Sequence, residues 1–374
     1  MTHESILLVA GEESGDRLGA MLLRELRTLA PGLDAWGIGG RHLADAGATI
    51  TIPLDEVNVV GFLEVVRNYR RLRATYHRLL DTVRSSPPRF AILIDFPGFN
   101  LRLARDLAVL GVPVLYYVAP QTWAWKEGRV AAMARTISQL VVLFPFEVEY
   151  FRQHGIPTLS FGHPLVSLPD RPIRSSEPAT KTPAIAYFPG SRIQELRRHL
   201  PLVRGVIERI GTRGRHLIAR AASVDRALLA REVAGLPVEI LDPETALGQA
   251  DVALVKVGTS TLNATLHAVP LVAFYRTSWI TYILARTFIK LPTVTMPNIL
   301  AGEQIVQEFI QGDATVEQLA SAVERLLDDS QMASVLRSRL DAVARSLYQE
   351  RTVERTARYV AERFGLIPRQ AGGV

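Results

Sequence analysis

The sequence predicts an α/β protein with two Rossmann-like, doubly wound domains that face a cleft. Short apolar runs typical of buried strands alternate with helical segments in both halves of the chain. Residues 167–183 are rich in Pro, Ser, Arg and Thr, lack periodicity and indicate a linker. We therefore expect domains at 1–166 and 184–345, and a helical segment at 346–374 that packs back toward the N-terminal domain.

The composition is that of a globular protein. Of 374 residues, 48% are hydrophobic and 21% charged, which excludes a largely disordered chain. The absence of cysteine excludes disulfides and thiolate metal sites and fits a reducing compartment. The N-terminus does not resemble a signal peptide, and no apolar run reaches the ~18 residues of a membrane span. The net charge of +6 is compatible with nucleic acid, anionic lipid or phosphorylated partners, and equally with plain solubility.

The first predicted strand, Ile6 to Ala10, ends in a tight polar loop. This loop, Gly11 to Asp16, contains two glycines and three acids, and a helix with leucines on one face follows it. Ligands of doubly wound sheets bind at the carboxyl ends of strands. The acids make the loop a poor cradle for a diphosphate and a better site for hydroxyl groups or a sugar.

A carboxylate follows the fully apolar strand from Phe90 to Ile94. Asp95 is therefore a candidate general base at the carboxyl end of a buried strand. The alternative is that Asp95 caps a helix that starts near Leu101. The sequence leaves both roles open.

Two tryptophans, Trp123 and Trp125, lie in a Pro-bearing loop after the next strand, Val112 to Val118. Loops held by a rigid scaffold often carry binding residues, so these side chains either contact a ligand or pack beneath the loop.

An apolar cluster directly precedes a basic cluster between residues 54 and 80. The apolar residues are Val59, Val60, Phe62, Leu63, Val65 and Val66, and the basic residues are Arg67, Arg70, Arg71 and Arg73. This pattern suits a surface that faces anionic lipid. An amphipathic core helix with a solvated arginine face is the alternative.

The second half opens with a strand at 184–188, followed by the turn Pro189-Gly190-Ser191-Arg192. Gly190 and Ser191 allow a ligand to approach the backbone, and the Arg192 guanidinium can bind a phosphate through two hydrogen bonds. The helical sequence that follows contains Pro201, which we expect to kink or divide it.

A second turn of this kind lies in the stretch from Asp251 to Gln304. After a predicted strand, the residues Gly258, Thr259, Ser260 and Thr261 form a small turn that leads into a helix. Free backbone N–H groups and the positive end of a helix dipole would there face an anion, for which a diphosphate is suitable. The alternative is an ordinary strand-to-helix turn with a threonine cap.

In combination, these segments resemble the lipid-A-disaccharide synthase family nearly end to end. The signatures AGExSGD, IDxPxFN, WAW, PGSR and PNxLAG occur in that order, and the combination is more specific than any one of them. The phosphate-type turns lie in the second half, and the carboxylate and aromatic residues lie in the first. This is the layout of GT-B glycosyltransferases.

The resemblance implies an inverting transfer in lipid A biosynthesis. The donor would be UDP-2,3-diacylglucosamine and the acceptor 2,3-diacylglucosamine 1-phosphate (lipid X). The products would be the β-1,6-linked disaccharide 1-phosphate and UDP. The resemblance also implies a peripheral protein on the cytoplasmic face of a Gram-negative inner membrane, bound to its anionic surface. A homodimer is compatible with it, and no nucleic-acid motif is present.

Roles for individual residues follow from the same resemblance. Asp95 matches the aspartate that deprotonates the acceptor 6-hydroxyl. The donor side comprises Gly190, Ser191, Arg192, Lys256, Gly258, Thr259, Thr261, Asn263, Tyr275, Asn298 and Gln304. The acceptor side comprises Glu12, Ser14, Gly15, Asp16, Asn100, Trp123 and Trp125. The membrane surface comprises Val59, Val60, Phe62, Leu63, Val66, Arg67, Arg70 and Arg71.

The sequence departs from the family pattern near the donor. Val257 and Asn263 replace residues of a common SGTATLE turn, whose Glu bonds a ribose hydroxyl in many GT-B enzymes. Glu303 stands where Arg is frequent, and Gly98 replaces an Asp. Lys256, also unusual, could supply a compensating charge. Two alternatives therefore remain: a GT-B transferase for another UDP-sugar or lipid acceptor, and a non-catalytic nucleotide- or lipid-binding paralogue.

Neither a metal ion nor another cofactor is expected. The sequence has no DxD motif after a strand, which metal-dependent sugar-nucleotide transferases use, and no His/Glu pair at ligand spacing. Arg192, Lys256 and a helix N-terminus could neutralise the leaving UDP in place of a metal.

Overall fold

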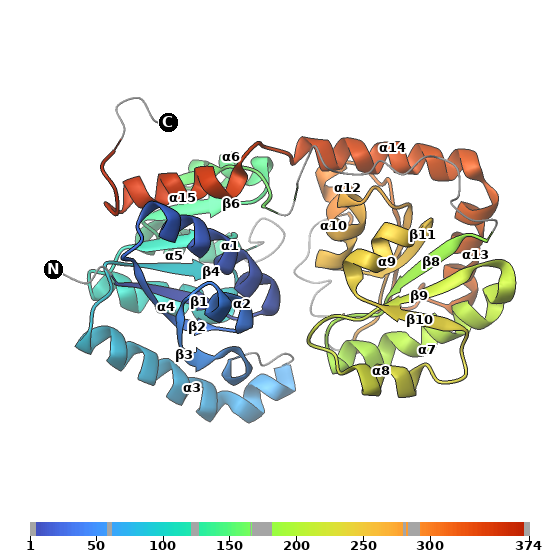
Figure 1. The fold of residues 1–374 in the computed structure, drawn as a ribbon, viewed down its shortest axis with the longest axis horizontal. Helices are drawn as coiled ribbons and strands as arrows, with labels where there is room; N and C mark the ends of the chain where they lie inside the picture. The colour runs from blue at the N-terminus through green and yellow to red at the C-terminus, as the bar shows by residue number, and fades with distance from the viewer. Residues whose placement is uncertain are drawn as a thin grey trace. The chain divides into compact units, whose positions relative to one another are not determined.

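The computed structural model describes residues 5–57, 62–120, 127–164, 166, 182–279, 282 and 292–369 (Figure 1). The chain divides into two compact units. The first contains residues Met1–Leu165 and Gln349–Val374, and the second contains Val166–Tyr348. Each unit has its own parallel sheet and its own apolar core.

The first unit is built on a seven-stranded sheet of order β3-β2-β1-β4-β5-β6-β7, in which all neighbours are parallel. The strands are β1 (Ser5–Ala10), β2 (Asp34–Gly39), β3 (Thr49–Pro53), β4 (Phe90–Ile94), β5 (Val114–Tyr117), β6 (Gln139–Val142) and β7 (Thr158–Ser160). The helices are α1 (Glu13–Leu29), α2 (Arg41–Asp45), α3 (Phe62–Ser85), α4 (Pro97–Val109), α5 (Val130–Thr136), α6 (Pro145–Gln153) and α15 (Thr352–Arg363). Every residue of β4 is buried, as expected for a central parallel strand covered on both faces.

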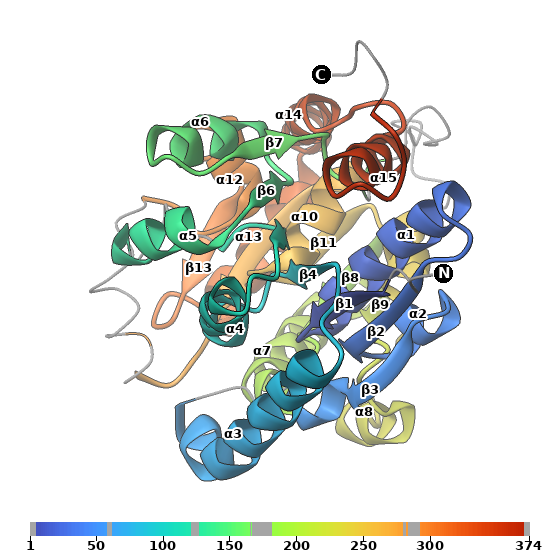
Figure 2. The same ribbon diagram turned by 90° about the vertical axis from the view of Figure 1, so that its left-hand side faces the viewer.

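The last helix of the chain belongs to the first unit. Helix α15 packs against α1, and both lie on the same side of the sheet (Figure 2). Arg89 donates hydrogen bonds to the carbonyl oxygens of Phe364 and Gly365, and the Phe90 and Phe364 rings stack with centroids 4.4 Å apart. The expected return of C-terminal helical sequence to the N-terminal domain is thus confirmed for α15, whereas α14 (Ser330–Ser346) belongs to the second unit.

The second unit is built on a six-stranded parallel sheet of order β10-β9-β8-β11-β12-β13. The strands are β8 (Ala184–Phe188), β9 (Arg215–Ala219), β10 (Val238–Leu241), β11 (Val252–Lys256), β12 (Leu271–Tyr275) and β13 (Gln307–Ile310). The helices, besides α14, are α7 (Ile193–Ile210), α8 (Arg226–Glu232), α9 (Pro243–Gln249), α10 (Thr259–Leu266), α12 (Met296–Ala301) and α13 (Val316–Asp328).

Helix α7 runs through Pro201 as one helix, so of the two expected effects, a kink or a division, the division does not occur. Leu200, Leu202, Val203 and Val206 are all buried around this proline. Burial of that apolar face offsets the lost backbone hydrogen bond.

Within the described part of the chain, no helix combines the length and the apolar character that a membrane span requires.

Candidate active site

Each sheet reverses its strand order at one place. In the first unit, β2 lies on one side of β1 and β4 on the other; in the second, β9 and β11 flank β8 in the same way. Open α/β sheets bind ligands at such switch points, outside the carboxyl ends of the strands. The turns after β1, β4, β8 and β11 therefore mark the candidate sites, and these turns hold most of the residues that the sequence singled out.

In the first unit, three glycines bring the turn after β1 and helix α1 close to β4. A Cβ on Gly11 would lie 2.1 Å from the Phe96 ring, and a Cβ on Gly19 would lie 2.5 Å from the Ile94 side chain. At Gly15 a Cβ would be in ordinary contact with Ile94, at 3.4 Å. Because glycine occupies these positions, Glu12 and Asp95 come within electrostatic reach of each other at the ends of neighbouring strands.

The backbone at Asp95 is strained and firmly held. Asp95 and Phe96 have φ angles of 45° and 49°, in the left-handed region that non-glycine residues rarely adopt. The Asp95 N–H donates to the Tyr117 carbonyl oxygen at 3.0 Å. Its carbonyl oxygen accepts hydrogen bonds from the Tyr116 hydroxyl at 2.6 Å and from Asn100 Nδ2 at 2.9 Å. Such over-determined strain is frequent at active sites.

The electrostatic setting of Asp95 suits a general base. Burial raises the pKa of Asp95 from 3.8 to about 7, and the negative charge of Glu12 adds to this effect. A base with a pKa near neutrality is deprotonated often enough to act and basic enough to accept a proton. The alternative role as a helix cap does not apply, because α4 begins at Pro97 with Phe96 as its N-cap.

Other predicted acceptor-side residues have structural partners. The Asp16 carboxylate is buried and accepts hydrogen bonds from the backbone N–H groups of Gly40, His42 and Leu43, at 2.6, 2.9 and 3.4 Å. Asp16 thus caps α2 rather than offering its oxygens to a sugar. The Asn100 amide nitrogen is likewise engaged with main-chain carbonyl oxygens, including that of Ile94 at 3.2 Å.

Two predicted acceptor-side residues are more accessible. Ser14 is exposed and Glu12 is half-buried, and both lie at the start of α1. Gly15 is buried and serves close packing. Trp123 and Trp125 lie outside the described residues.

In the second unit, two glycine turns lie side by side. Phe188 and Val255 are paired in register, so the turn after β8 and the turn after β11 leave the same edge of the sheet. Gly190 and Gly258 have φ angles of 131° and 143°, which disfavour any side chain. Ser191 and Arg192 then lead into α7, and Gly258 is the N-cap of α10. Two helix N-termini therefore begin at one switch point.

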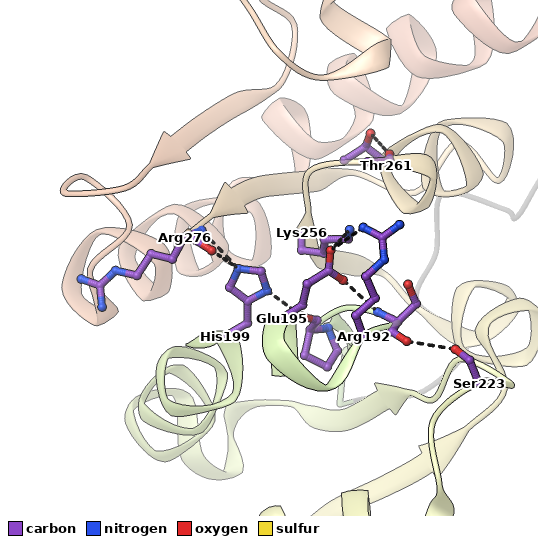
Figure 3. A network of polar contacts seen from close by, with 10 residues as sticks. Arg192, Glu195, His199, Ser223, Lys256, Thr261 and Arg276 are labelled. Atoms are coloured by element: carbon purple, nitrogen blue, oxygen red, sulfur yellow. Dashed lines mark hydrogen bonds and ion pairs between the residues drawn. The ribbon is translucent and has the colours of Figure 1, made fainter. Parts of the chain in front are cut away.

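Lys256 and Glu195 form a nearly buried ion pair between these two turns (Figure 3). Lys256 Nζ lies 2.8 Å from Glu195 Oε1, and their side chains are 13% and 10% exposed. Glu195 Oε2 accepts the Ser191 N–H at 3.1 Å, and Arg192 Nη1 lies 3.7 Å from Oε1. Lys256 lies between the two turns that were predicted to bind a diphosphate, but its charge is already matched by a carboxylate.

The threonines of the second turn differ in exposure. Thr259 begins α10 and is exposed, whereas Thr261 is fully buried and donates its hydroxyl to the Gly258 carbonyl oxygen at 2.7 Å. Thr261 therefore shapes the turn. Asn263, one turn further on, is half-buried, and its amide makes no hydrogen bond to any described residue.

His199 connects the first turn to Tyr275-Arg276. It is fully buried, and its ring nitrogens lie 2.7 Å from the Pro189 carbonyl oxygen and 3.1 Å from the Arg276 backbone nitrogen. The same ring nitrogen that faces the Arg276 N–H also lies 3.0 Å from the Arg276 carbonyl oxygen, and burial lowers the pKa of His199. The Tyr275 ring lies 5.6 Å from His199, and burial together with the charge of Glu195 raises the Tyr275 pKa.

Asn298 has a structural role instead of the predicted donor contact. Its amide nitrogen donates to the Val306 carbonyl oxygen and to Glu308 Oε1, at 2.9 and 2.7 Å. Its amide oxygen accepts the N–H groups of Ile305 and Val306, each at 2.8 Å. These four bonds use the full capacity of the side chain. Asn298 thus ties α12 to β13, and these partners leave no donor or acceptor of its amide group unused; its predicted contact with the donor stays a prediction.

The remaining departures near the predicted donor side lie at the surface or in the core. Glu303 is exposed and forms an ion pair with Arg339 of α14, so its reversed charge is compensated within the protein. Gln304 is exposed, and Val257 packs against the core of the second unit.

Sequence reasoning missed four residues that organise these turns. They are Tyr116, Glu195, His199 and Glu308. Glu308 accepts the N–H groups of Val294 and Thr295 ahead of α12, in addition to its bond from Asn298. Only Glu195 had a local signal, because an acid three residues after an N-cap commonly binds back to the backbone. The others depend on partners distant in sequence.

The predicted membrane surface is described only in part. Residues 59 and 60, and the side chains of Phe62, Leu63, Val66 and Arg67, lie outside the described set. Arg70 and Arg71 are exposed on α3, whereas Leu79, Leu80 and Val83 further along are buried. The later half of α3 is thus an amphipathic core helix with a solvated arginine face.

Solved structures with the same fold are glycosyltransferases and related sugar-nucleotide proteins. The calicheamicin glycosyltransferase CalG4 matches with a TM-score of 0.62 and 18% identity, over 99% of this chain and 100% of that chain. Acinetobacter baumannii MurG matches with a TM-score of 0.55 and 15% identity, over 96% of this chain and 99% of that chain. The two parallel α/β units and the helical C-terminal region therefore define a GT-B fold.

The sequence comparisons identify the family. The model of the family described as lipid-A-disaccharide synthetase matches residues 6–362. The lipid-A-disaccharide synthase of Anaeromyxobacter dehalogenans is 40% identical over 341 residues, 87% of this chain and 88% of the relative. The lipid-A-disaccharide synthase of Koribacter versatilis is 33% identical over 368 residues, which cover 95% of this chain and 96% of the relative. The chain belongs to the lipid-A-disaccharide synthase family, glycosyltransferases that form the lipid A disaccharide.

Proposed function

We propose that this protein transfers 2,3-diacylglucosamine from UDP to the 6-hydroxyl of 2,3-diacylglucosamine 1-phosphate, with inversion at the anomeric carbon. Asp95 is the general base. Its position at the switch point of the first unit and its pKa of about 7 are the observation that carries this assignment.

The step is a single displacement. The acceptor oxygen forms a bond to the anomeric carbon as the bond from that carbon to the UDP oxygen breaks. The proton of the acceptor hydroxyl passes to the Asp95 carboxylate, and UDP leaves with the bonding electron pair. Inversion needs no covalent intermediate, so one base is sufficient. In this proposal Glu12 and Ser14, at the start of α1, bind acceptor hydroxyl groups.

The second unit binds the donor in this proposal. The N–H groups at the starts of α7 and α10 face the diphosphate, and Arg192 and Lys256 supply positive charge. Negative charge builds up on UDP as its bond breaks, and these groups stabilise it. Asn263 of α10 and Tyr275 at the end of β12 contact the rest of the nucleotide sugar in this proposal.

We also propose that the protein binds the anionic surface of the inner membrane from the cytoplasmic side. The exposed Arg70 and Arg71 of α3 follow an apolar sequence in a protein whose substrates carry acyl chains. Basic residues beside an apolar segment favour anionic lipid.

A transfer assay in mixed micelles tests the reaction. Purified protein is supplied with UDP-2,3-diacylglucosamine and 2,3-diacylglucosamine 1-phosphate, with and without EDTA, and Asp95→Ala is assayed alongside. We expect disaccharide 1-phosphate and UDP from the wild type in both conditions, and a large loss of turnover in Asp95→Ala. Unchanged turnover in the variant would remove Asp95 as the base. No product from folded wild-type protein that still binds UDP would instead point to a different sugar donor.

A vesicle assay tests the membrane surface. Arg70→Glu/Arg71→Glu should sediment less than the wild type with vesicles that contain anionic phospholipid. The difference between the two proteins should be larger at low salt. Arg226→Glu/Arg231→Glu is a matched control, since both arginines are exposed on α8 in the second unit. Equal sedimentation of all three proteins would show that α3 does not bind the membrane and is a core helix with a solvated arginine face.

A further inference from the structure

The Glu195 carboxylate lies where a phosphate would bind. It accepts the N–H of Ser191, in the turn just before α7, through one oxygen and the Lys256 ammonium through the other, and Arg192 approaches the latter oxygen (Figure 3). These are the kinds of group that hold a nucleotide diphosphate: a backbone N–H in a glycine turn beside a helix N-terminus, an ammonium and a guanidinium. The protein thus binds its own anion at this switch point.

Glu195 cancels part of the positive charge at this place. Lys256 and Arg192 each carry one positive charge and Glu195 one negative charge, which leaves one positive charge for an incoming diphosphate. Burial by itself would raise the pKa of Glu195, but Lys256 and then Arg192 outweigh burial and hold its pKa below the usual range. Glu195 is therefore ionised at neutral pH, and its charge opposes an incoming anion at close range.

Glu195 is buried at the first turn of α7, and its position there depends on its polar contacts. The glutamate side chain has three rotatable bonds, so it can adopt another rotamer when a ligand takes over those contacts. Gly190 brings the turn so close that a Cβ there would lie 2.6 Å from Glu195 Oε2. A ligand that comes to the Ser191 N–H must therefore take the place of this oxygen.

We propose that Glu195 is a displaceable counter-ion of the donor site. Without nucleotide it neutralises Lys256 and covers the Ser191 N–H, and on binding the diphosphate takes both groups over while the carboxylate turns away. When UDP departs, Glu195 returns to the cations. The residue thereby weakens UDP binding and favours product release. This inference rests on the proposed donor site in the second unit.

Calorimetric titration of the full-length protein with UDP and with uridine tests this role. Glu195→Gln keeps an oxygen that can accept the Ser191 N–H but removes the competing charge. We expect it to bind UDP about tenfold more tightly than the wild type, with a larger difference at low salt. Uridine, which has no phosphate, should bind both proteins equally. Inhibition of the transferase by UDP should strengthen in parallel.

A purely structural role for Glu195 gives the opposite result. If the carboxylate only keeps Lys256 in place, Glu195→Gln binds UDP more weakly, and this outcome would overturn the proposal. Glu239→Gln is the matched control, because it breaks the exposed ion pair with Arg215 in the same unit and should leave UDP binding unchanged.

Glu195→Gln leaves Lys256 unpaired, which can prevent folding. A second comparison, built on Lys256→Gln, tests the proposal in that case. Lys256→Gln should bind UDP more weakly than the wild type. Adding Glu195→Gln to it removes both charges, and the double variant should bind UDP more tightly than Lys256→Gln. Equal or weaker binding by the double variant contradicts the proposal. If neither the wild type nor Glu239→Gln binds UDP, the donor site itself is wrong and the inference falls with it.

Discussion

The Tyr116 hydroxyl donates a hydrogen bond of 2.6 Å to the main-chain carbonyl oxygen of Asp95. Tyr116 is in β5, next to β4 in the sheet, and is fully buried. The bond therefore connects the strand core to the strained residue that we assign as the base. It fixes the backbone of Asp95 and leaves the carboxylate available for chemistry.

Tyr116→Phe should lower both stability and turnover. Loss of one buried hydrogen bond costs about 1 kcal/mol in the free energy of unfolding. We expect kcat to fall about tenfold, because small displacements of a catalytic group are costly. Tyr187→Phe is the control: it removes a buried hydroxyl that bonds to His216 in the other unit, at 2.9 Å. It should lose similar stability without the same loss of kcat, and equal kcat losses would refute the specific role of Tyr116.

The raised pKa of Asp95 should appear in both activity and stability. The rate constant kcat/KM should rise with pH through about 7, as the base loses its proton. The unfolded carboxyl titrates near 3.8, so the folded protein binds this proton more tightly between about pH 4 and pH 7. The stabilisation that this proton gives the folded protein is complete below the unfolded pKa of 3.8, and it is lost as the pH rises through the folded pKa of about 7.

Asp95→Asn should remove this pH dependence. Relative to the wild type, the variant should gain up to roughly 4 kcal/mol of stability between pH 4 and pH 8, as expected for a shift of about three pKa units. Chemical denaturation at several pH values measures the difference. We also expect kcat to fall about 10²–10⁴-fold. A stability difference that is constant with pH would show that the Asp95 pKa is not raised.

Gly11→Ala should disturb the site through Phe96. The added Cβ would lie 2.1–2.5 Å from three atoms of the Phe96 ring, which therefore has to move together with the strained turn. We expect a loss of about 1–3 kcal/mol in stability and a clear fall in kcat. Gly98→Ala is the matched control, because its Cβ would meet no heavy atom within 4 Å. Thermal unfolding and the transfer assay distinguish the two, and similar behaviour of both would contradict this packing argument.

Asn298→Asp should destabilise the second unit although the side chains have the same shape. The substitution replaces a donor by a carboxylate oxygen beside Glu308 Oε1, which lies 2.7 Å from Asn298 Nδ2. Repulsion between the two carboxylates and the lost hydrogen bonds should lower the free energy of unfolding by about 2–4 kcal/mol. Asn263→Asp changes the same chemical group where it has no partner among the described residues, and it should alter unfolding little. Equal unfolding curves for the two variants would argue against the structural role of Asn298.

Much of the framework could be predicted from the sequence. The apolar runs at 6–10 and 90–94 are buried strands, and the polar turns after them meet at one switch point, because parallel strands bring their carboxyl ends together. The predicted helix start near Leu101 was wrong by four residues, since Pro97 favours the first turn of a helix and Phe96 can cap it without a side-chain bond.

The sequence by itself determined the alternation of strands and helices, the glycine turns at the ends of strands, and the family. The first two features are local, with signals within a few neighbouring residues, and the family follows from several such local motifs in a fixed order along the chain. Only the tertiary structure decided which polar side chains remain for a substrate. Asp16 and Asn298 match family motifs, but the backbone around residues 40–43 and the 305–308 segment occupy their hydrogen bonds. Lys256 likewise meets Glu195, 61 positions earlier in the chain. Burial and pairing arise from contacts between distant segments, which fix the pKa of Asp95 and the charge left for a diphosphate.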